Sequence, residues 1–560
     1  MYREMRIPVV LLFYVLFNSL ALIPLRSCGQ EWMVPVGKSI LLSGNFGELR
    51  ATHFHSGIDI RTGGVEGLPV VCVKDGYLVR VSVSPVGYGQ AMYIEHADGT
   101  TSVYGHLQRF VPVVAEIVRS IQYEKEHFQV DEDFREYRLF FKQGDTIAYS
   151  GNTGSSGGPH LHFEIRNTAS ERAINPLSFY SIRDRKAPSV KSIYLYAVSG
   201  GGCADLLKRV GVKVQGGGRY GAGTVGVPAG KVGVGVFATD YMEDSWNKLG
   251  VYRMTLVADS DTLFELSMDS CSFEQACLIN EVKDFDAYKK KETVYRCFGN
   301  YQHRFLGIRN RNGGYIEVEK DSLVKVNIVL EDKNMNRSEV SLLLKGVEAR
   351  QEAEAGIVKY DKDELLELPG CRVELPAGSL FSSVRKRLRV EKDTLTGRDI
   401  FVLSEREVPL FHKAHLFLSG DFGVQDLIYE VASDGRKYVV ETVHTDAGLK
   451  AEINYLSRYA VVKDEQAPEI TFLGKFQERA LRFRIKDKLS GIKTYRGEVN
   501  GKWCLFSYDP RVDLLQCSLE EPVFQKGRIN EVRIEAVDRA GNKNELIVKV
   551  KNRKQWKKRR

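Results

Sequence analysis

Short runs of β-branched and aromatic residues dominate the chain from about residue 30 to about Tyr180. The run at 76–83 is typical, because hydrophobic and polar residues alternate along it. Turns such as Ala97-Asp98-Gly99 separate the runs and predict hairpins. The other predicted strands here are 68–73, 91–95 and 101–107. This part of the chain is therefore predicted to be an all-β domain.

One segment interrupts the β pattern. From Phe110 to Ile121, apolar residues recur at helical spacing, and Pro112 suits a first helical turn. We expect a helix of about four turns in an insertion at about 108–143, followed by a strand at 137–141. The insertion either borders a cleft and controls access to it, or only packs against the domain without a role in access.

The rest of the chain contains two pairs of similar stretches. Residues 184–188 return as 464–468, both reading D-x-x-A-P, and residues 329–336 resemble 536–542. Repeated entry and exit sequences around strand-rich stretches indicate β-sandwich modules. The stretch between these modules is also strand-rich, so we expect a third sandwich there. The glycine-rich segment at 200–235 lacks the context of a nucleotide site and predicts hairpin loops.

Charge excludes nucleic acid as an expected partner. The formal net charge is +8, but the last ten residues contain seven Lys or Arg and no acid, so the remainder is nearly neutral. The tail is expected to be solvated, with contact to an anionic surface as the alternative.

The first residues resemble a secretory signal: Arg3 and Arg6 precede an uncharged apolar run at 7–25. A retained membrane helix and lipidation at Cys28 are the alternatives. The chain contains nine cysteines without a metal-type spacing. Cys504 and Cys517, expected on neighbouring strands, are the preferred disulfide pair.

Seven of the eleven histidines lie between His53 and His162, which points to a site. In a strand, His160, His162 and Glu164 share one face, while the three residues between and after them form a core face. His55 and Asp59 stand close together upstream, and His106 lies between the two groups.

These residues suit zinc chemistry. A catalytic zinc takes three protein ligands and leaves one position to water, and His55, Asp59 and one histidine of the His160/His162 pair complete such a set. There is no H-E-x-x-H motif. His106 and the remaining histidine of the pair are therefore the expected general base and transition-state stabiliser.

The three motifs H-x-x-x-D, Y-G-H-L and G-N-T-G-S-S-G-G-P-H-L-H-F-E together resemble the lysostaphin-type M23 metallopeptidases over residues 40–180. The resemblance implies His55, Asp59 and His162 as zinc (Zn²⁺) ligands, with His106 and His160 as catalytic histidines. The layout as a whole is similar to that of large Bacteroides-type envelope members.

The expected fold is mainly β: a lysostaphin-like β-sheet peptidase domain with a helical insertion, followed by Ig-like β-sandwich modules. The expected parts are a signal peptide at 1–29, the peptidase domain at 30–184, sandwich modules at 185–345, 346–465 and 466–552, and a basic tail at 553–560.

The resemblance implies an exported endopeptidase, in the periplasm or envelope of a Gram-negative bacterium, acting on peptidoglycan stem peptides. The bond implied is the D-alanyl–diaminopimelate cross-link. Two alternatives stay open. The domain could be a silent or occluded scaffold that activates other wall hydrolases, or a metallopeptidase acting on proteins.

Several other residues have two interpretations. Tyr104 could stabilise an oxyanion or pack beside His106, and His53 could line the cleft. His96 is expected to be structural. The Asp and Asn residues near Asp240 and Asp538 could bind calcium, but turn formation is preferred, because these side chains bond to their own backbone.

Overall fold

The computed structural model describes residues 31–199, 202–300, 305, 307–348, 356–393, 397–432, 435–477 and 479–551. The expected signal peptide, Cys28 and the basic tail at 553–560 lie outside these ranges. Within them, no helix is long and apolar enough to span a bilayer. The fold is mainly β, as predicted from the alternating pattern.

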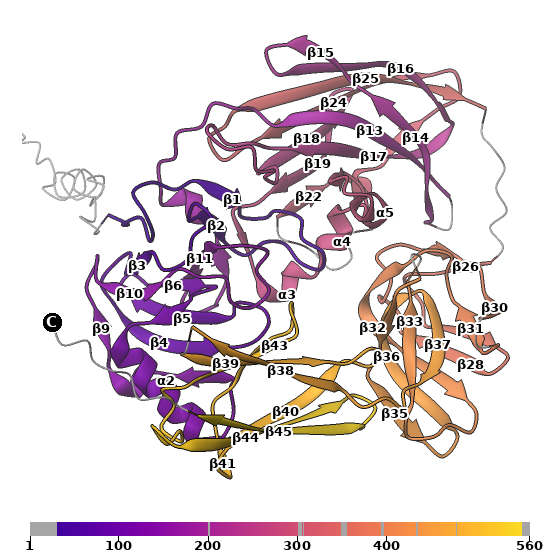
Figure 1. The fold of residues 1–560 in the computed structure, drawn as a ribbon. Coiled ribbons are helices and arrows are strands. Elements are labelled where there is room, and N and C mark those ends of the chain that lie inside the picture. Colours follow the sequence, from indigo (N-terminus) through magenta and orange to yellow (C-terminus); the bar gives the residue numbers. More distant parts are fainter. Residues whose placement is uncertain are drawn as a thin grey trace, which may run out of the picture.

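A large antiparallel sheet and a small one form the N-terminal domain (Figure 1). The large sheet follows the order β1 (Leu42–Gly44), β2 (Ile58–Arg61), β11 (His160–Asn167), β6 (Thr100–Gly105), β5 (Gln90–His96), β4 (Gly76–Val83) and β8 (Val130–Asp133). The small sheet contains β3 (Pro69–Val71), β10 (Thr146–Tyr149) and β7 (Arg109–Phe110). Leu161, Phe163 and Ile165 of β11 are fully buried in the domain core, as the alternation predicts.

The predicted helix in the insertion is confirmed as α2 (Pro112–Glu124), with proline in its first turn. Val114 and Val118 bury its inner face. The strand predicted at 137–141 is wrong in its first part. A 3₁₀ turn, Arg135–Tyr137, comes first, and only β9 (Phe140–Phe141) pairs with β4.

The first sandwich follows at β13–β25. One sheet contains β13 (Ser189–Val198), β14 (Ala204–Gly211), β17 (Gly230–Thr239), β21 (Val294–Arg296) and β23 (Ile316–Val318). The other contains β15 (Lys213–Gly216), β16 (Arg219–Pro228), β18 (Arg253–Ala258), β19 (Asp261–Ser267), β22 (Ile308–Asn310), β24 (Leu323–Glu331) and β25 (Arg337–Val347). The glycine-rich segment therefore forms paired strands and their turns. Three short helices, α3 (Phe273–Ala276), α4 (Ile279–Val282) and α5 (Phe285–Lys289), connect β20 to β21.

The peptidase-like domain and the first sandwich share structure across their boundary. The strand β20 (Ser270–Cys271) pairs with β12 (Ala173–Ile174) at the edge of the large N-terminal sheet. Phe46, Leu49 and Phe54 pack in the core of the sandwich. The side chain of Asn45 donates to Gly250 O at 2.8 Å and accepts from Gly250 N at 2.7 Å. These contacts fix the loop that leads into β2.

Two further sandwiches complete the chain. The next has sheets of β27 (Glu364–Leu368), β28 (Cys371–Leu375), β32 (Val408–Ser419), β36 (Gly448–Leu456) and β35 (Thr442–Thr445), and of β30 (Arg389–Lys392), β31 (Asp399–Val402), β37 (Arg458–Lys463), β33 (Asp426–Val431) and β34 (Lys437–Val439). A small pair, β26 (Ile357–Val358) and β29 (Val384–Arg385), lies beside them. The last has sheets of β38 (Glu469–Phe476), β39 (Ala480–Lys486), β43 (Leu514–Ser518) and β42 (Ser507–Asp509), and of β41 (Lys502–Trp503), β40 (Ile492–Val499), β44 (Ile529–Asp538) and β45 (Lys543–Lys551).

The expected cysteine pair lies in the last sandwich, but not on neighbouring strands. Cys517 belongs to β43, while Cys504 follows β41 in the opposite sheet. Both side chains are buried, their Sγ atoms are 3.3 Å apart, and both are free thiols. The disulfide expected between neighbouring strands is therefore, in this structure, a contact between two thiols across the interior of the sandwich.

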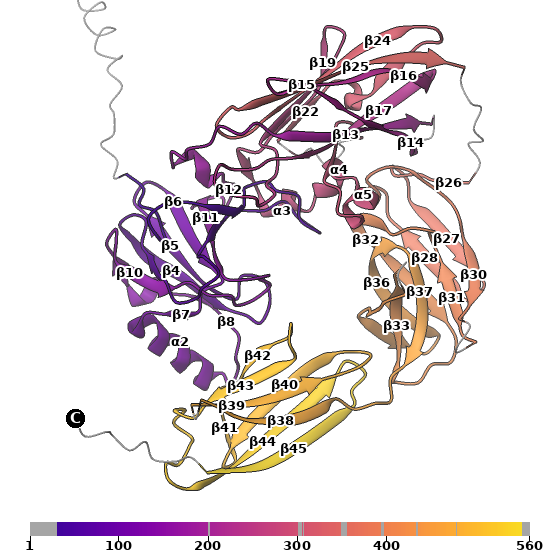
Figure 2. The ribbon, with the colours of Figure 1, turned by 45° about the horizontal axis from the view of Figure 1, so that its top comes forward.

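The four parts follow one another around a closed circuit, and the last sandwich returns to the N-terminal domain (Figure 2). Glu521 accepts hydrogen bonds from Arg119 and Tyr123 of α2, and the Tyr123 ring meets Trp503 edge to face. The insertion is thus the surface on which the last sandwich docks.

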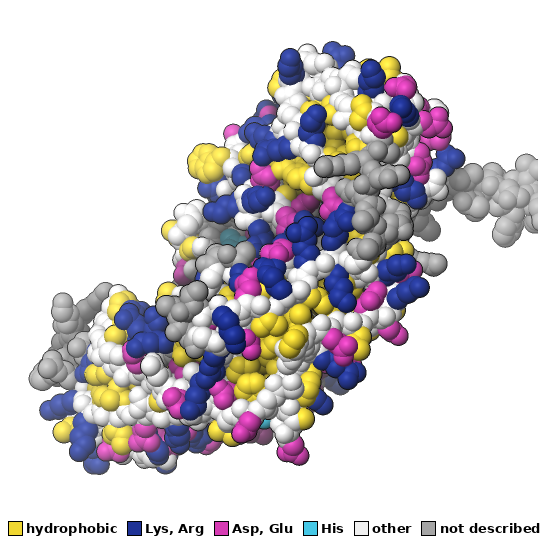
Figure 3. Space-filling view, turned by 90° about the vertical axis from the view of Figure 1, so that its right-hand side faces the viewer, with side chains coloured by type: hydrophobic (Ala, Val, Ile, Leu, Met, Phe, Trp, Pro, Cys, Tyr) yellow, Lys and Arg dark blue, Asp and Glu magenta, His cyan; other side chains and the backbone are white. Residues whose placement is uncertain are grey.

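Ion pairs connect the first and second sandwiches. Figure 3 shows acidic and basic side chains mixed across the middle of one face of the molecule. Arg385 bonds to Asp205 at 3.0 Å and Arg406 to Asp286 at 2.6 Å. These groups border a cavity of about 690 Å³. Since all four side chains are partly exposed, each pair contributes little to stability.

Asn45 offers a test of the shared structure between the first two parts. We expect Asn45→Ala to lower the free energy of unfolding by about 2–4 kcal/mol, because it leaves the buried N–H and C=O of Gly250 unpaired. Urea unfolding measures this, with Asn454→Ala, at an exposed strand position, as the matched control. Equal stability of the two variants would show that the Asn45 contacts do not hold the domains together.

Candidate metal centre

Strand register brings the three candidate ligands together. On β11, His162 lies opposite Asp59 of β2, and it also lies opposite Gly105 of β6, the residue before His106. His55 enters from the loop before β2. Gly57 lies against β11, where a Cβ atom would meet Phe163 O at 2.4 Å, so the H-S-G-I-D sequence needs a glycine there.

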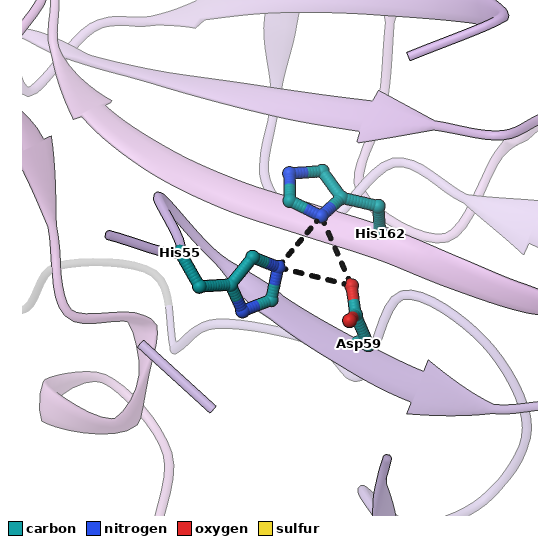
Figure 4. A group of neighbouring side chains, drawn as sticks. All are labelled: His55, Asp59 and His162. Atoms are coloured by element: carbon teal, nitrogen blue, oxygen red, sulfur yellow. Dashed lines mark hydrogen bonds and ion pairs between the residues drawn. The ribbon is translucent and has the colours of Figure 1, made fainter. Parts of the chain in front are cut away.

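Three donor atoms converge at this point, as Figure 4 shows. His55 Nε2 lies 3.1 Å from Asp59 Oδ1 and 3.1 Å from His162 Nδ1, and His162 Nδ1 lies 3.0 Å from Asp59 Oδ1. Ligands at 2.0–2.1 Å from a tetrahedral metal ion are separated by about 3.3 Å. All three residues are buried. The spacing and the donor types fit one metal ion.

Each histidine of the trio is oriented by a hydrogen bond on its other ring nitrogen. His55 Nδ1 lies 2.9 Å from Asn45 O, and His162 Nε2 lies 2.8 Å from Glu164 Oε1. These acceptors hold the N–H on the outer nitrogen and leave the inner nitrogen free to bind a metal. Because Asn45 also bonds to Gly250, the first sandwich helps to orient His55.

Asp59 is oriented by Arg50, which donates to Asp59 Oδ2 at 2.7 Å and leaves Oδ1 facing the histidines. The backbone beside Arg50 is fixed in turn by Lys283, whose Nζ donates to Arg50 O and Ala51 O at 3.0 and 2.6 Å. Burial lowers the pKa of Lys283 to about 8. Lys283 of the first sandwich therefore supports the trio through the backbone on either side of the Arg50–Ala51 peptide bond.

Glu164 is the centre of a buried hydrogen-bond network beneath the site. It accepts from Ser56 Oγ at 2.5 Å, from Tyr88 Oη at 2.6 Å and from Arg166 Nε at 2.7 Å. Burial alone would raise the pKa of Glu164, but Arg166 and His162 outweigh it and hold the pKa well below the ordinary value. A fixed negative charge therefore lies behind His162.

The electrostatic setting of His162 differs from that of His106. Burial alone would lower the pKa of His162, but its hydrogen bonds to Asp59 and Glu164 raise it to about 9. Burial, followed by repulsion from His162 and His160, lowers the pKa of His106 to about 3. His106 is therefore a neutral imidazole at physiological pH.

His106 and His160 face each other beside the trio, with ring centroids 4.8 Å apart. His106 Nδ1 lies 2.8 Å from Thr153 O, and His160 Nδ1 lies 2.8 Å from Gly158 O. These carbonyls hold the N–H on Nδ1 of each ring and direct both Nε2 atoms into the site, where His160 Nε2 lies 3.4 Å from Asp59 Oδ1. His160 is the more exposed of the two, at 15% of its side chain.

The structure separates the other sequence candidates from this cluster. Tyr104 is fully buried, and its hydroxyl accepts from Val73 N, so the packed interpretation holds and the oxyanion role is wrong. His53 is exposed and bonds to Thr52. His96 bonds to Asp75 O and Ser102, a structural role as predicted.

Sequence reasoning missed the residues that support the ligands. Arg50, Tyr88 and Arg166 carry no recognisable spacing relative to the histidine motifs. Glu164 could have been found, because it shares the His160 and His162 face of the strand. Asn45 could not have been found from the sequence, since its partner, Gly250, lies 205 residues away.

The last sandwich reaches the edge of this site. Arg511, in the turn between β42 and β43, donates to Ser156 O at 2.7 Å and lies 3.5 Å from Asn152 Oδ1. Ser156 Oγ is itself 3.2 Å from His160 Nδ1. The glycine-rich loop before β11 is thus contacted on one side by the last sandwich and on the other by His160.

A β-sheet site with two histidines and one aspartate around a common point, and two further histidines beside them, defines a metallopeptidase class of domain. Residues 53–121 and 136–176 match Peptidase family M23. The N-terminal domain belongs to this family, as the three motifs suggested. Residues 355–464 match the Zu5-like domain.

Three curated relatives align with the same domain. An uncharacterized metalloprotease of Haemophilus influenzae is 31% identical over 22% of this chain and 20% of its own length. The DD-carboxypeptidase/endopeptidase Mpg of Neisseria meningitidis is 29% identical over 23% of this chain and 24% of its own. The murein hydrolase activator EnvC of Escherichia coli is 30% identical over 20% of this chain and 21% of its own. The chain thus spans only a fifth to a quarter of these relatives.

The raised pKa of His162 gives a pH dependence in chelated protein. Its folded value, about 9, lies above its ordinary value of 6.5. Protonation of His162 therefore stabilises the fold fully below pH 6.5, and this contribution, roughly 3 kcal/mol, is lost as the pH rises through 9. Urea unfolding in the presence of a chelator at pH 6.5 and pH 9 measures this contribution.

We expect His162→Asn to remove the pH dependence of the free energy of unfolding, and His127→Asn, at an exposed position, to retain it. If the free energy of unfolding of His162→Asn still fell between pH 6.5 and pH 9 as much as that of the wild type, this account would be contradicted.

Proposed function

We propose that this protein is an exported, zinc-dependent endopeptidase that hydrolyses peptide cross-links of peptidoglycan. The observation that carries the proposal is the convergence of His55, Asp59 and His162, with their donor atoms 3.0–3.1 Å apart. Imidazole and carboxylate donors in a buried trio suit Zn²⁺. Their outer hydrogen bonds match the support that zinc-bound histidines require.

Zinc at this site would supply a water of lowered pKa and polarise the scissile carbonyl. The chain's own residues supply the proton transfers. His106, neutral and with its Nε2 lone pair free, is suited to accept a proton from the attacking water. His160 presents its Nε2 from the more exposed side. Once Nε2 is protonated, the imidazolium can stabilise the developing charge or pass that proton to the leaving amine.

The names of two relatives support peptidoglycan as the substrate. One is named a DD-carboxypeptidase/endopeptidase and another a murein hydrolase activator. The second name refers to murein hydrolysis, and the apolar N-terminal segment of this chain suits export. We therefore propose stem-peptide cross-links as the substrate, in the periplasm or envelope of a Gram-negative bacterium.

Purified sacculi provide the test. We expect the full chain to release un-cross-linked muropeptides, to lose this activity with a chelator and to recover it with Zn²⁺. His160→Ala is expected to lower the rate at least a hundredfold, because it removes a proton-transfer group, while keeping bound metal. His127→Ala is the matched control. Cleavage of protein substrates with intact sacculi would favour a protein-directed peptidase instead, and a chain without bound metal would overturn the ligand assignment.

A second candidate function is a restrained enzyme or wall-hydrolase scaffold. The observation that favours it is the contact of Arg511 with Ser156 and Asn152, on the loop that carries His160. The docking of Glu521 on α2 holds the last sandwich in that position. Access of a large substrate to the site would then depend on the release of this sandwich.

Arg511→Ala tests the restraint. If the contact limits access, we expect the variant to cleave sacculi several-fold faster than the wild type, with unchanged metal content, because the loop before β11 is freed. Arg484→Ala, at an exposed position of the same sandwich, is the matched control. Equal rates for all three proteins would exclude the Arg511 contact as a restraint.

A further inference from the structure

Two clusters of three aspartates lie at the domain junctions, away from the metallopeptidase site. The first contains Asp184, Asp240 and Asp332, whose candidate ligand oxygens all lie within 4.8 Å of one another. Asp184 belongs to the connection before β13, Asp240 follows β17, and Asp332 follows β24. The cluster therefore joins the segment leaving the N-terminal domain to two strand ends of the first sandwich.

Turn formation explains part of this cluster. Asp184 Oδ1 accepts from Lys186 N at 3.1 Å and Glu243 N at 3.2 Å. Both oxygens of Asp332 accept from Asn336, at 2.8 and 2.6 Å. These two carboxylates have the backbone and side-chain partners that Asp residues take in turns.

Asp240 is not explained in this way. Its side chain is 97% buried, since only 3% of the residue is exposed. Its Oδ1 has no hydrogen-bond partner. One oxygen of the same carboxylate lies within 4.8 Å of an oxygen of each of the other two aspartates. Burial, and then the charges of Asp332 and Asp184, raise the pKa of Asp240 to about 8. A buried acceptor without a donor, placed beside two like charges, points to a cation.

The second cluster repeats the first in the last sandwich. It contains Asp464, Asp487 and Asp538, again with oxygens within 4.8 Å of one another. Asp464 lies in the connection before β38, Asp487 follows β39, and Asp538 ends β44. Each cluster thus takes one aspartate from the preceding connection, one from the end of an early strand and one from the turn before the last strand.

The hydrogen bonds of two of the three aspartates correspond between the clusters, while Asp487, unlike Asp240, accepts from the backbone of Leu489 and Gly491 at 2.9 and 2.8 Å. Asn542 N and Nδ2 donate to Asp538 at 2.8 and 2.9 Å, as Asn336 does to Asp332. Asn542 Nδ2 also donates to Asp464 O at 2.7 Å, and Asn336 Nδ2 to Asp184 O at 3.2 Å. The same scaffold therefore presents the same three carboxylates in both sandwiches.

A buried tyrosine adds to the second cluster. Tyr429 is fully buried, and its hydroxyl has no hydrogen-bond partner. Burial, together with the negative charges of Asp464, Asp487 and Asp538, raises the pKa of its phenol. This polar group comes from the preceding sandwich, so the second cluster also lies across a junction.

We propose that each aspartate cluster binds one calcium ion and that the bound ions fix the angle between successive domains. The donors are carboxylate oxygens without histidine or cysteine, which suits a hard cation, and Ca²⁺ accepts such irregular oxygen sets more readily than Mg²⁺ does. Asp184 and Asp464 lie in the connecting segments, so a cation shared with the strand-end aspartates joins each connection to its sandwich. This site does not depend on the proposed peptidase activity.

Calcium binding by the full chain tests the proposal. In calcium-free buffer, titration of the zinc-loaded protein with CaCl₂ is expected to show two sites and a rise in the midpoint of thermal unfolding. We expect Asp240→Asn to remove one site and Asp538→Asn the other. Asp244→Asn, at an exposed position beside the first cluster, is the control and should retain both.

The outcomes separate a calcium site from a structural turn. Without calcium and above pH 8, where Asp240 is ionised, Asp240→Asn should unfold at or above the wild-type midpoint, because it removes one of three repelling charges. Added calcium should stabilise it less than it does the wild type. No calcium binding by the wild type would overturn the proposal. So would equal destabilisation of Asp240→Asn with and without calcium, or tighter binding of MgCl₂ than of CaCl₂.

Discussion

The candidate metal centre depends on forcing three mutually unfavourable groups to one point. His55 Nε2, His162 Nδ1 and Asp59 Oδ1 are all lone-pair donors when they are ready for a metal, and all are buried. Such a cluster stays in place only if surrounding hydrogen bonds fix each ring and the carboxylate. Asn45, Glu164 and Arg50 provide those bonds, one for each ligand.

These supports explain why the first sandwich is tied so closely to the N-terminal domain. Asn45 is held by Gly250, and the backbone at Arg50 is held by Lys283, both from the first sandwich. The strand β20 continues the sheet that carries His162. Two of the three candidate ligands are therefore positioned by groups beyond residue 240, so the sheet that carries His162 and the first sandwich form a single framework.

Sequence reasoning reached the parts of the structure that local pattern determines. Alternation placed Leu161 and Phe163 in the core, and helical spacing with Pro112 located α2. The same strand logic put His162 and Glu164 on one face, where they bond directly. It missed contacts between residues far apart in sequence, such as Asn45 with Gly250. It also left two interpretations open for Tyr104, because a motif shows which residues are adjacent in sequence and not which way a side chain points.

The contrast between the two kinds of acidic site in this chain follows from their counter-charges. At the candidate metal centre, burial alone would raise the pKa of Asp59, but the charge of His55 and hydrogen bonds from His160, His162 and His55 hold it well below the ordinary value. Arg50 lies 2.7 Å from the same carboxylate. At the first junction, the contacts described for Asp240 and Asp332 include no basic side chain, and burial raises the pKa of both. A carboxylate with a built-in cation keeps its charge and is prepared to act as one ligand among several. A group of carboxylates without one is stable as anions only when a cation enters, which is why the junctions, and not Asp59 alone, are the proposed calcium sites.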